Sequence, residues 1–226
     1  MTKTLDLIDT ALVTGGAGGI GRAIAETLIR CGKTVVIAGR TESKLKDTAA
    51  QIGAAAYYVL DTGDTSQIAD VSRRILADYP DLNCLVNNAG VQRPFTFPAA
   101  GVGAGAGGKG EADEDGYGFD LAKADQEIDI NIRGPLHLTL RFLPHLLALP
   151  EGKTGVIMNV SSVLGFLPAS VINPVYNGTK AWVHFFTTNL RSQYNLAGKG
   201  ERLKIIEIAP PSVTTELVRP LLSRLS

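Results

Sequence analysis

The sequence predicts an α/β fold: a doubly wound, parallel, Rossmann-like sheet with helices on both faces, giving three layers. Three observations support it. Short β-branched runs alternate with helical patterns, the first run ends in a glycine cluster, and polar residues follow several of the runs. Alternating strands and helices give a parallel sheet whose ligand crevice lies at the carboxyl ends of the strands. We expect one dinucleotide-binding domain over residues 1–226.

The first predicted unit is a strand over 10–14, a glycine turn over 15–21 and a helix from Ala23. Glycines let the backbone approach a phosphate, and a helix N-terminus favours an anion, so this order favours a dinucleotide. A flexible connector is the alternative. Further strands are expected over 34–38, 56–60, 83–86, 155–160 and 203–209, and further helices over 43–52, over 66–79, from about 121 and from 174.

The ends of the next strands carry candidate cofactor contacts. Arg40 stands where dinucleotide folds usually have an acid for the adenosine ribose, so a 2′-phosphate meets a donor instead of a carboxylate, and NADP is favoured over NAD. A solvated loop charge is the alternative for Arg40. Asp61 is placed to accept a hydrogen bond from the adenine amine, or is a turn residue. Asn87 and Asn88 can tie strands together and wall the cleft, and for Asn88 we favour the structural role.

A segment rich in glycine, alanine and acidic residues over about 96–118 cannot build a core, and we expect a mobile insertion loop there. A long helix should follow from Leu121, with a bend at Pro144. Asn131 lies inside this helix, where asparagine is a mediocre helix former.

A phenol and an ammonium stand four residues apart at Tyr176 and Lys180. Asn173 is a good N-cap and Pro174 suits the first helical position, so a helix should begin there, with Tyr176 and Lys180 on one face. The lysine charge should lower the tyrosine pKa from about 10 toward a range useful for proton transfer. The alternative is an ordinary surface helix.

The composition points to a small-molecule partner. Lys plus Arg and Asp plus Glu number 22 each, so no net field favours nucleic acid or an acidic membrane. Cys31 and Cys84 are too few for a disulfide framework or a zinc site, and no metal site is expected. No signal peptide or membrane-spanning run is found in the sequence. We expect a protein of the reducing cytoplasm.

Taken together, the motifs resemble those of the short-chain dehydrogenase/reductase family, in its single-domain branch, from about residue 8 to 217. The matching residues are Thr14 with the glycine run to Gly21, Asn87-Asn88-Ala89-Gly90, Asn131, Ser162, Tyr176 with Lys180, and the stretch from Pro210 to Thr215.

The resemblance implies residue roles. Tyr176 would be the general acid in reduction and the general base in oxidation, with Lys180 binding the nicotinamide ribose. Ser162, chosen over its neighbour Ser161, would polarise the substrate carbonyl, and Asn131 would hold a water in the proton relay. The implied cofactor contacts are Gly15, Gly19, Ile20, Gly21, Arg40, Asp61, Asn88, Tyr176, Lys180, Val213 and Thr215.

The implied activity is hydride transfer between NADP(H) and a carbonyl or secondary alcohol. Pro211 replaces a glycine usual in the family, and the chain ends before the usual last strand, which would leave the sixth strand as an apolar edge. A non-catalytic NADP-binding regulator or a truncated inactive member is therefore the alternative function. The family also implies a homodimer or homotetramer through the long helices, in which Trp182, Phe185 and Phe186 could be core or interface residues.

Overall fold

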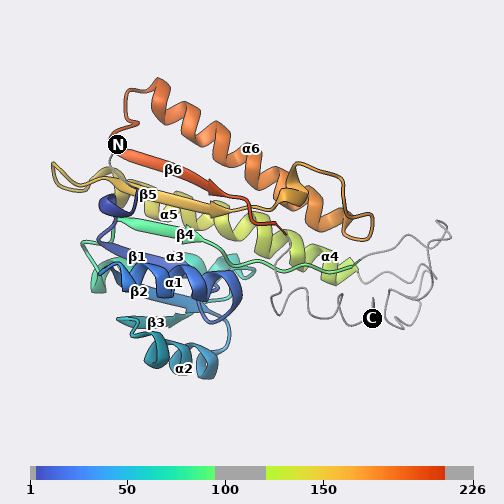
Figure 1. Cartoon of the computed structure of the whole chain (residues 1–226), viewed down its shortest axis with the longest axis horizontal. Helices are drawn as coiled ribbons and strands as arrows, with labels where there is room; N and C mark the ends of the chain where they lie inside the picture. The colour runs from blue at the N-terminus through green and yellow to red at the C-terminus, as the bar shows by residue number, and fades with distance from the viewer. Residues whose placement is uncertain (1–3, 95–120, 212–226) are drawn as a thin grey trace.

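The computed structural model describes residues 4–94 and 121–211. They form one six-stranded, fully parallel sheet in the order β3-β2-β1-β4-β5-β6 (Figure 1). The order reverses between β1 and β4, and a crevice is expected at that switch point. The strands are β1 (Thr10–Thr14), β2 (Thr34–Gly39), β3 (Ala56–Val59), β4 (Cys84–Asn87), β5 (Gly155–Val160) and β6 (Leu203–Ile208).

The predicted doubly wound fold is confirmed. The helices α1 and α2 cover one face of the sheet, and α3, α5 and α6 cover the other (Figure 1). A short 3-10 helix, η1 (Thr4–Leu7), precedes the sheet, and another, η4 (Val163–Gly165), follows β5. The α-helices are α1 (Gly19–Arg30), α2 (Glu42–Ile52), α3 (Thr65–Asp78), α4 (Leu121–Ile128), α5 (Gly134–Leu147) and α6 (Pro174–Leu196).

The helix predicted from Leu121 contains a π-helical segment, η3 (Asp129–Arg133), between α4 and α5. Its central residue, Asn131, is 1 % exposed, and Gly134 follows at a close approach, since a Cβ there would lie 2.7 Å from the Thr62 backbone oxygen. Pro144 lies inside α5, which continues to Leu147. The wide turn places Asn131 toward the carboxyl ends of the strands.

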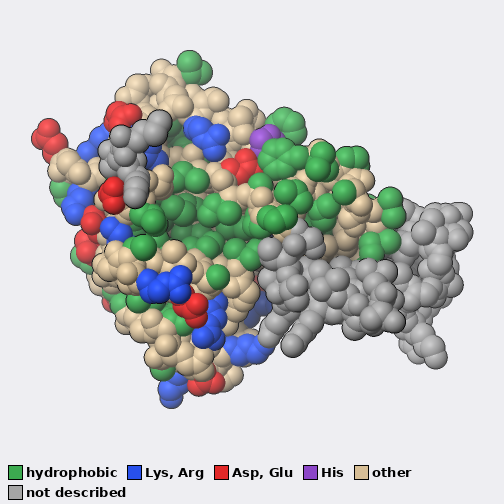
Figure 2. Space-filling view, viewed as in Figure 1, with side chains coloured by type: hydrophobic (Ala, Val, Ile, Leu, Met, Phe, Trp, Pro, Cys, Tyr) green, Lys and Arg blue, Asp and Glu red, His purple; other side chains and the backbone are tan. Residues whose placement is uncertain are grey.

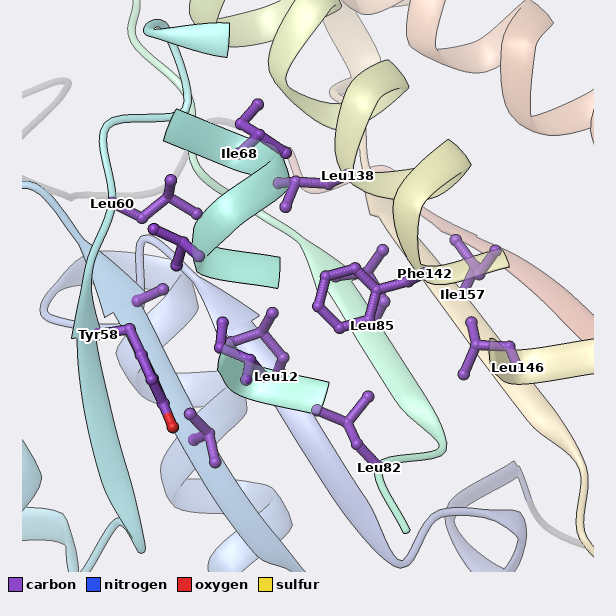
Figure 3. Packing of buried hydrophobic residues seen from close by; sticks show 14 of the residues in the cluster. Leu12, Tyr58, Leu60, Ile68, Leu82, Leu85, Leu138, Phe142, Leu146 and Ile157 are labelled. Carbon is purple, nitrogen blue, oxygen red and sulfur yellow. The ribbon is translucent and has the colours of Figure 1, made fainter. Parts of the chain in front are cut away.

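Two apolar clusters hold the layers together. The first joins the sheet to α3 and α5, and Figure 3 shows Leu12 and Leu85 of the strands near Leu138 and Phe142 of α5. The second lies under α1 and α2 and extends along β5 and β6, where Ile206 and Ile208 are only partly buried. Hydrophobic side chains gather on the surface between α1 and α6 (Figure 2). Among the described strands, β6 is an edge, as expected.

Buried carboxamides join neighbouring strands near their carboxyl ends. Asn87 Nδ2 donates to Asn159 Oδ1 at 2.9 Å and to Thr139 Oγ1 at 3.1 Å. Asn159 Nδ2 in turn donates to Thr187 Oγ1 at 2.9 Å. The network connects β4, β5, α5 and α6, so it fixes the strand ends and the helix that carries Tyr176. Because its members are buried, each hydrogen bond removes a desolvation cost of about 1–3 kcal/mol.

Within the described ranges, no helix is both long and apolar enough to cross a membrane. The two cysteines are free thiols, Cys31 exposed and Cys84 buried. The predicted insertion loop at 96–118 lies wholly outside the described residues, and so does the C-terminal stretch with Val213 and Thr215.

Candidate active site

The turn between β1 and α1 is built by glycines that have different surroundings. Gly15 and Gly19 have positive φ values of 66° and 52°, where a Cβ is strained. At Gly21, an added Cβ would lie 2.3 Å from Asn88 Nδ2 and 2.4 Å from the Gly15 oxygen. Gly21 therefore lets α1 pack against the turn.

Gly18, by contrast, has open space beside it. An ideal Cβ on this residue would have no described atom within 4 Å. Gly18 is the N-cap of α1, and it supplies no side-chain hydrogen bond to the first turn, which begins with Gly19 and Ile20. The first amides of a helix have no partner within the helix, and here the cap leaves them open. Such an N-terminus fits the pyrophosphate of a dinucleotide.

Asn88 has the structural role that its position favoured. Its Nδ2 donates to the Thr14 backbone oxygen at 2.9 Å, and its backbone N–H donates to Thr14 Oγ1 at 3.0 Å. The Thr14 hydroxyl donates onward to the Val86 oxygen at 3.1 Å. These bonds join the ends of β1 and β4 and hold the glycine turn in place.

Two further predicted nucleotide contacts, Arg40 and Asp61, lie along the same edge of the sheet. Arg40 is exposed directly after β2. Asp61 follows β3, and its Oδ1 accepts a hydrogen bond from the Gly63 N–H at 2.9 Å, which is the turn role that the sequence left open. The adenine contact proposed for Asp61 stays a prediction.

The structure brings Ser162 and Tyr176 together. Ser162 follows β5 and is 7 % exposed, and its side chain is close enough to the Tyr176 phenol to lower the pKa of that phenol. Its Oγ accepts a hydrogen bond from the Leu164 N–H at 3.2 Å. The neighbouring Ser161 instead donates to the Ile208 oxygen at 3.4 Å. Of the two serines, Ser162 is the one whose side chain affects the Tyr176 phenol. The substrate role stays a prediction.

Lys180 lies close to Tyr176 on α6. Its Nζ is 5.5 Å from the centroid of the Tyr176 ring and donates to the Val160 oxygen at 2.9 Å. The side chain is 5 % exposed, and burial lowers the Lys180 pKa to about 8, against an opposing effect of the Glu127 charge. Lys180 is thus a buried ammonium held at the carboxyl end of β5.

The predicted lowering of the Tyr176 pKa is wrong for the chain alone. Burial raises this pKa above its ordinary value, the neighbouring Ser162 side chain lowers it, and the charge of Glu127 raises it further. Burial dominates because a phenolate loses its hydration when it leaves water. The sequence shows that a lysine is one turn away, but it does not show how deeply the phenol is buried.

The Asn131 side chain connects two parts of the site. Its Oδ1 accepts from the Val91 N–H and its Nδ2 donates to the Val91 oxygen, both at 2.9 Å. The same Nδ2 also donates to Thr179 Oγ1 at 3.1 Å. The amide thus fastens the segment after β4 to α6, beside Lys180. The water-holding role stays a prediction.

The helix that carries the pair begins at Pro174, as predicted, but Asn173 does not cap it with its side chain. Asn173 Nδ2 donates instead to Ser170 Oγ at 2.7 Å, and Asn177 Nδ2 donates to the Ser170 oxygen at 2.8 Å. The two asparagines therefore hold the loop that leads from η4 into α6.

Sequence reasoning missed Glu127 at the end of α4. Its side chain is 1 % exposed, and burial raises its pKa to about 7 against the charges of Arg93 and Lys180. One signal was available in the sequence, since Glu127 precedes Asn131 by four residues and so lies near the same helix face.

Comparison with known proteins agrees with this arrangement. The family model for short chain dehydrogenases matches residues 9–225. An uncharacterized oxidoreductase, DltE, of Bacillus subtilis is 37% identical over 209 residues, 92% of this chain and 73% of that protein. Serine 3-dehydrogenase of Rhizobium radiobacter is 33% identical over 215 residues, 93% of this chain and 75% of that protein.

Solved structures give the same result. A putative NAD(P)-dependent gluconate 5-dehydrogenase from Beutenbergia cavernae, with bound NADP, superposes with a TM-score of 0.75 at 29% identity, covering 95% of this chain and 76% of that one. The Pseudomonas aeruginosa RhlG/NADP complex has a TM-score of 0.80 at 21% identity, covering 99% and 80%, and supports the fold alone. The chain therefore belongs to the short-chain dehydrogenase family of oxidoreductases.

Proposed function

We propose that the protein transfers a hydride between NADP(H) and a small-molecule carbonyl or secondary alcohol. The observation that supports this most directly is the partly buried phenol of Tyr176, close enough to Ser162 for that side chain to lower its pKa, and flanked by Lys180 at the carboxyl end of β5. Proton transfer needs a group whose proton is directed at the reacting oxygen, and the phenol and hydroxyl together offer two donors to one substrate oxygen.

In this proposal Tyr176 gives a proton to the carbonyl oxygen in reduction and takes it back in oxidation, while Ser162 polarises that oxygen. The bound cofactor would supply the hydride donor or acceptor. Lys180 would hold the nicotinamide ribose, and the first turn of α1 would hold the pyrophosphate. The open space at Gly18 supports this fit. Val213 and Thr215 would hold the carboxamide.

A fluorescence titration with NADPH and NADH, followed by turnover on a panel of aldehydes and ketones, tests the proposal. We expect saturable NADPH binding and carbonyl-dependent oxidation of NADPH. Nucleotide binding without turnover on any carbonyl, single turnover included, would instead favour a non-catalytic NADP-binding protein. That alternative rests on Pro211, which follows the end of β6 at a position where the family resemblance implies a glycine.

NADP preference rests on Arg40, whose exposed guanidinium follows β2. We expect Arg40→Ser to weaken NADPH binding by about 10–100-fold, because a hydrogen bond to a charged group contributes about 1.5–3 kcal/mol. NADH binding should change little, since NADH has no 2′-phosphate. Competitive fluorescence titrations measure both affinities.

The matched control for this change is Arg30→Ser, which removes an exposed arginine at the C-terminal end of α1. It should leave both affinities unchanged. An equal loss of NADPH and NADH binding in Arg40→Ser would show that Arg40 does not read the 2′-phosphate, and an unchanged NADPH affinity would remove the basis for preferring NADP.

The proposal also includes the oligomeric state of the protein and the cell compartment in which it works. Trp182 and Phe186 stack with ring centroids 4.9 Å apart, and the neighbouring Phe185 is 65% exposed, so this face of α6 is suited to contact a second copy in a homodimer or homotetramer. Two free thiols suit a reducing cytoplasm. Light scattering of the purified chain would decide the oligomeric state.

A further inference from the structure

The last turn of α4 buries a carboxyl group that the proposed reaction does not use. Glu127 is 1 % exposed, and its Oε1 has no hydrogen-bond partner among the described residues. Glutamate is almost never this deeply buried unless it is paired, because an ionised carboxylate loses its hydration in the interior. A carboxyl group buried in this way must either have its negative charge stabilised by neighbouring groups or be protonated.

The groups that act on Glu127 come from two neighbouring elements. From the segment after β4, the charge of Arg93 and its backbone N–H both favour the ionised form of the carboxyl and so lower its pKa. From α6, which packs against α4, come Lys180 and Tyr176, and each responds to the charge of Glu127. The charge of Glu127 is therefore coupled both to the segment after β4 and to the two residues expected to handle the proton.

The charge of Glu127 acts on the pair in a consistent direction. A nearby negative charge favours the ammonium form of Lys180 and disfavours the phenolate form of Tyr176. Lys180 needs this support, because its side chain is buried and its Nζ donates a hydrogen bond to a neutral acceptor, the Val160 oxygen. Without Glu127, both residues should lose their protons more readily.

We propose that Glu127 is a positioning residue whose buried carboxylate keeps Lys180 charged and makes proton transfer at Tyr176 depend on the charge of Glu127. The proposal rests on the proposed function, in which Tyr176 exchanges the proton. In this proposal the Glu127 carboxyl on α4 acts through Lys180 and Tyr176 and does not itself contact the reacting oxygen.

The pH dependence follows from the pKa of Glu127, which burial raises to about 7. Below this pH the carboxyl is neutral and has no effect on Tyr176. Above it, the carboxylate forms while Lys180, whose pKa is about 8, is still largely charged. The carboxylate raises the Tyr176 pKa, so oxidation, which needs the phenolate, should reach its plateau at a higher pH than in a chain without this charge.

Glu127→Gln keeps the shape and removes the charge, and its test needs no turnover. The chain has six tyrosines, so the ultraviolet titration of each chain is compared with that of the same chain carrying Tyr176→Phe, and the difference reports Tyr176 alone. In Glu127→Gln the Tyr176 titration should move to lower pH, with roughly a threefold or greater rise in the phenolate fraction at a fixed pH on the rising limb. The limb of kcat/KM for alcohol oxidation should move the same way.

Asp125→Asn is the matched control, because it removes an acidic charge from the exposed face of the same helix. It should leave the Tyr176 titration unchanged. Glu127→Met, which is neutral and similar in length, should reproduce the shift and serves if Glu127→Gln folds poorly by circular dichroism. If Glu127 had only a packing role, its substitution would lower activity equally at every pH and would leave the Tyr176 titration unchanged.

The outcomes separate the two proposals. If a folded Glu127→Gln or Glu127→Met chain titrates like the unsubstituted chain, the role of Glu127 is overturned whether or not carbonyls are reduced. If the titration moves but no carbonyl is turned over by the unsubstituted chain, the electrostatic role of Glu127 stands and hydride transfer fails as the function. A shift to higher pH would also overturn the role, because its sign is opposite.

Discussion

Tyr176→Phe is expected to lower kcat for NADPH-dependent carbonyl reduction by about 10²–10⁴-fold, the usual contribution of a positioned general acid. The Ser162 side chain is close enough to affect the phenol, and Lys180 Nζ lies 5.5 Å from the ring centroid. Phenylalanine keeps the ring and removes only the proton donor. NADPH affinity should change little. Steady-state kinetics on a responsive carbonyl, with a fluorescence titration of NADPH, measures both quantities.

Tyr194→Phe is the control, since Tyr194 lies on the same helix and packs against the apolar cluster of α3 and α5. It should turn over like the unsubstituted chain. If Tyr176→Phe also keeps full activity, another group delivers the proton and the site assignment is wrong. A loss of activity together with a loss of NADPH binding would indicate a damaged fold.

The strands were predictable because each is a short buried run with clear ends. β1 and β5 match the predicted ranges 10–14 and 155–160, and they are buried along their whole length. A parallel strand covered on both faces is apolar throughout, so its limits show in the sequence. The first residue of α6 was equally clear, since Pro174 fixes it.

The π-helical segment at Asp129–Arg133 was not predictable, because tertiary contacts determine it. Asn131 bonds to Val91 and Thr179, and Gly134 approaches Thr62, so residues distant in the sequence together determine the wide turn. Helical periodicity gives a side chain's direction around its own helix. It does not identify the partner across the interface.

The same limit explains the electrostatics of the site. From the sequence, Tyr176 had one visible charged neighbour, Lys180, four residues away. The structure adds burial and the carboxyl of Glu127, both of which raise the Tyr176 pKa. Residue types and spacing therefore predicted which groups meet, whereas the protonation state depended on depth of burial and on a charge from another helix.

Gly21→Ala and Gly18→Ala are expected to separate folding from cofactor binding at the glycine turn. A Cβ on Gly21 would lie 2.4 Å from the Gly15 backbone oxygen, which cannot move without shifting the turn. Overpacking of this kind costs about 1–3 kcal/mol or more, which corresponds to roughly 3–10 °C in the melting temperature of a chain of this size. Gly18 has φ −170°, an extended conformation open to any residue, so Gly18→Ala should cost less than about 1 kcal/mol.

The effects on NADPH affinity should be separate from the effects on stability: Gly18→Ala should weaken NADPH binding while it leaves stability nearly unchanged. Because the methyl group of Gly18→Ala would occupy the space beside the α1 N-terminus, NADPH binding should weaken by about tenfold or more in a chain that melts nearly normally. Thermal denaturation and NADPH titration of both variants measure this. If Gly18→Ala binds NADPH as the unsubstituted chain does, the phosphates do not approach α1 at Gly18. If Gly21→Ala melts normally, the turn can accommodate a methyl group, and the inference that Gly21 must pack closely against Asn88 is wrong.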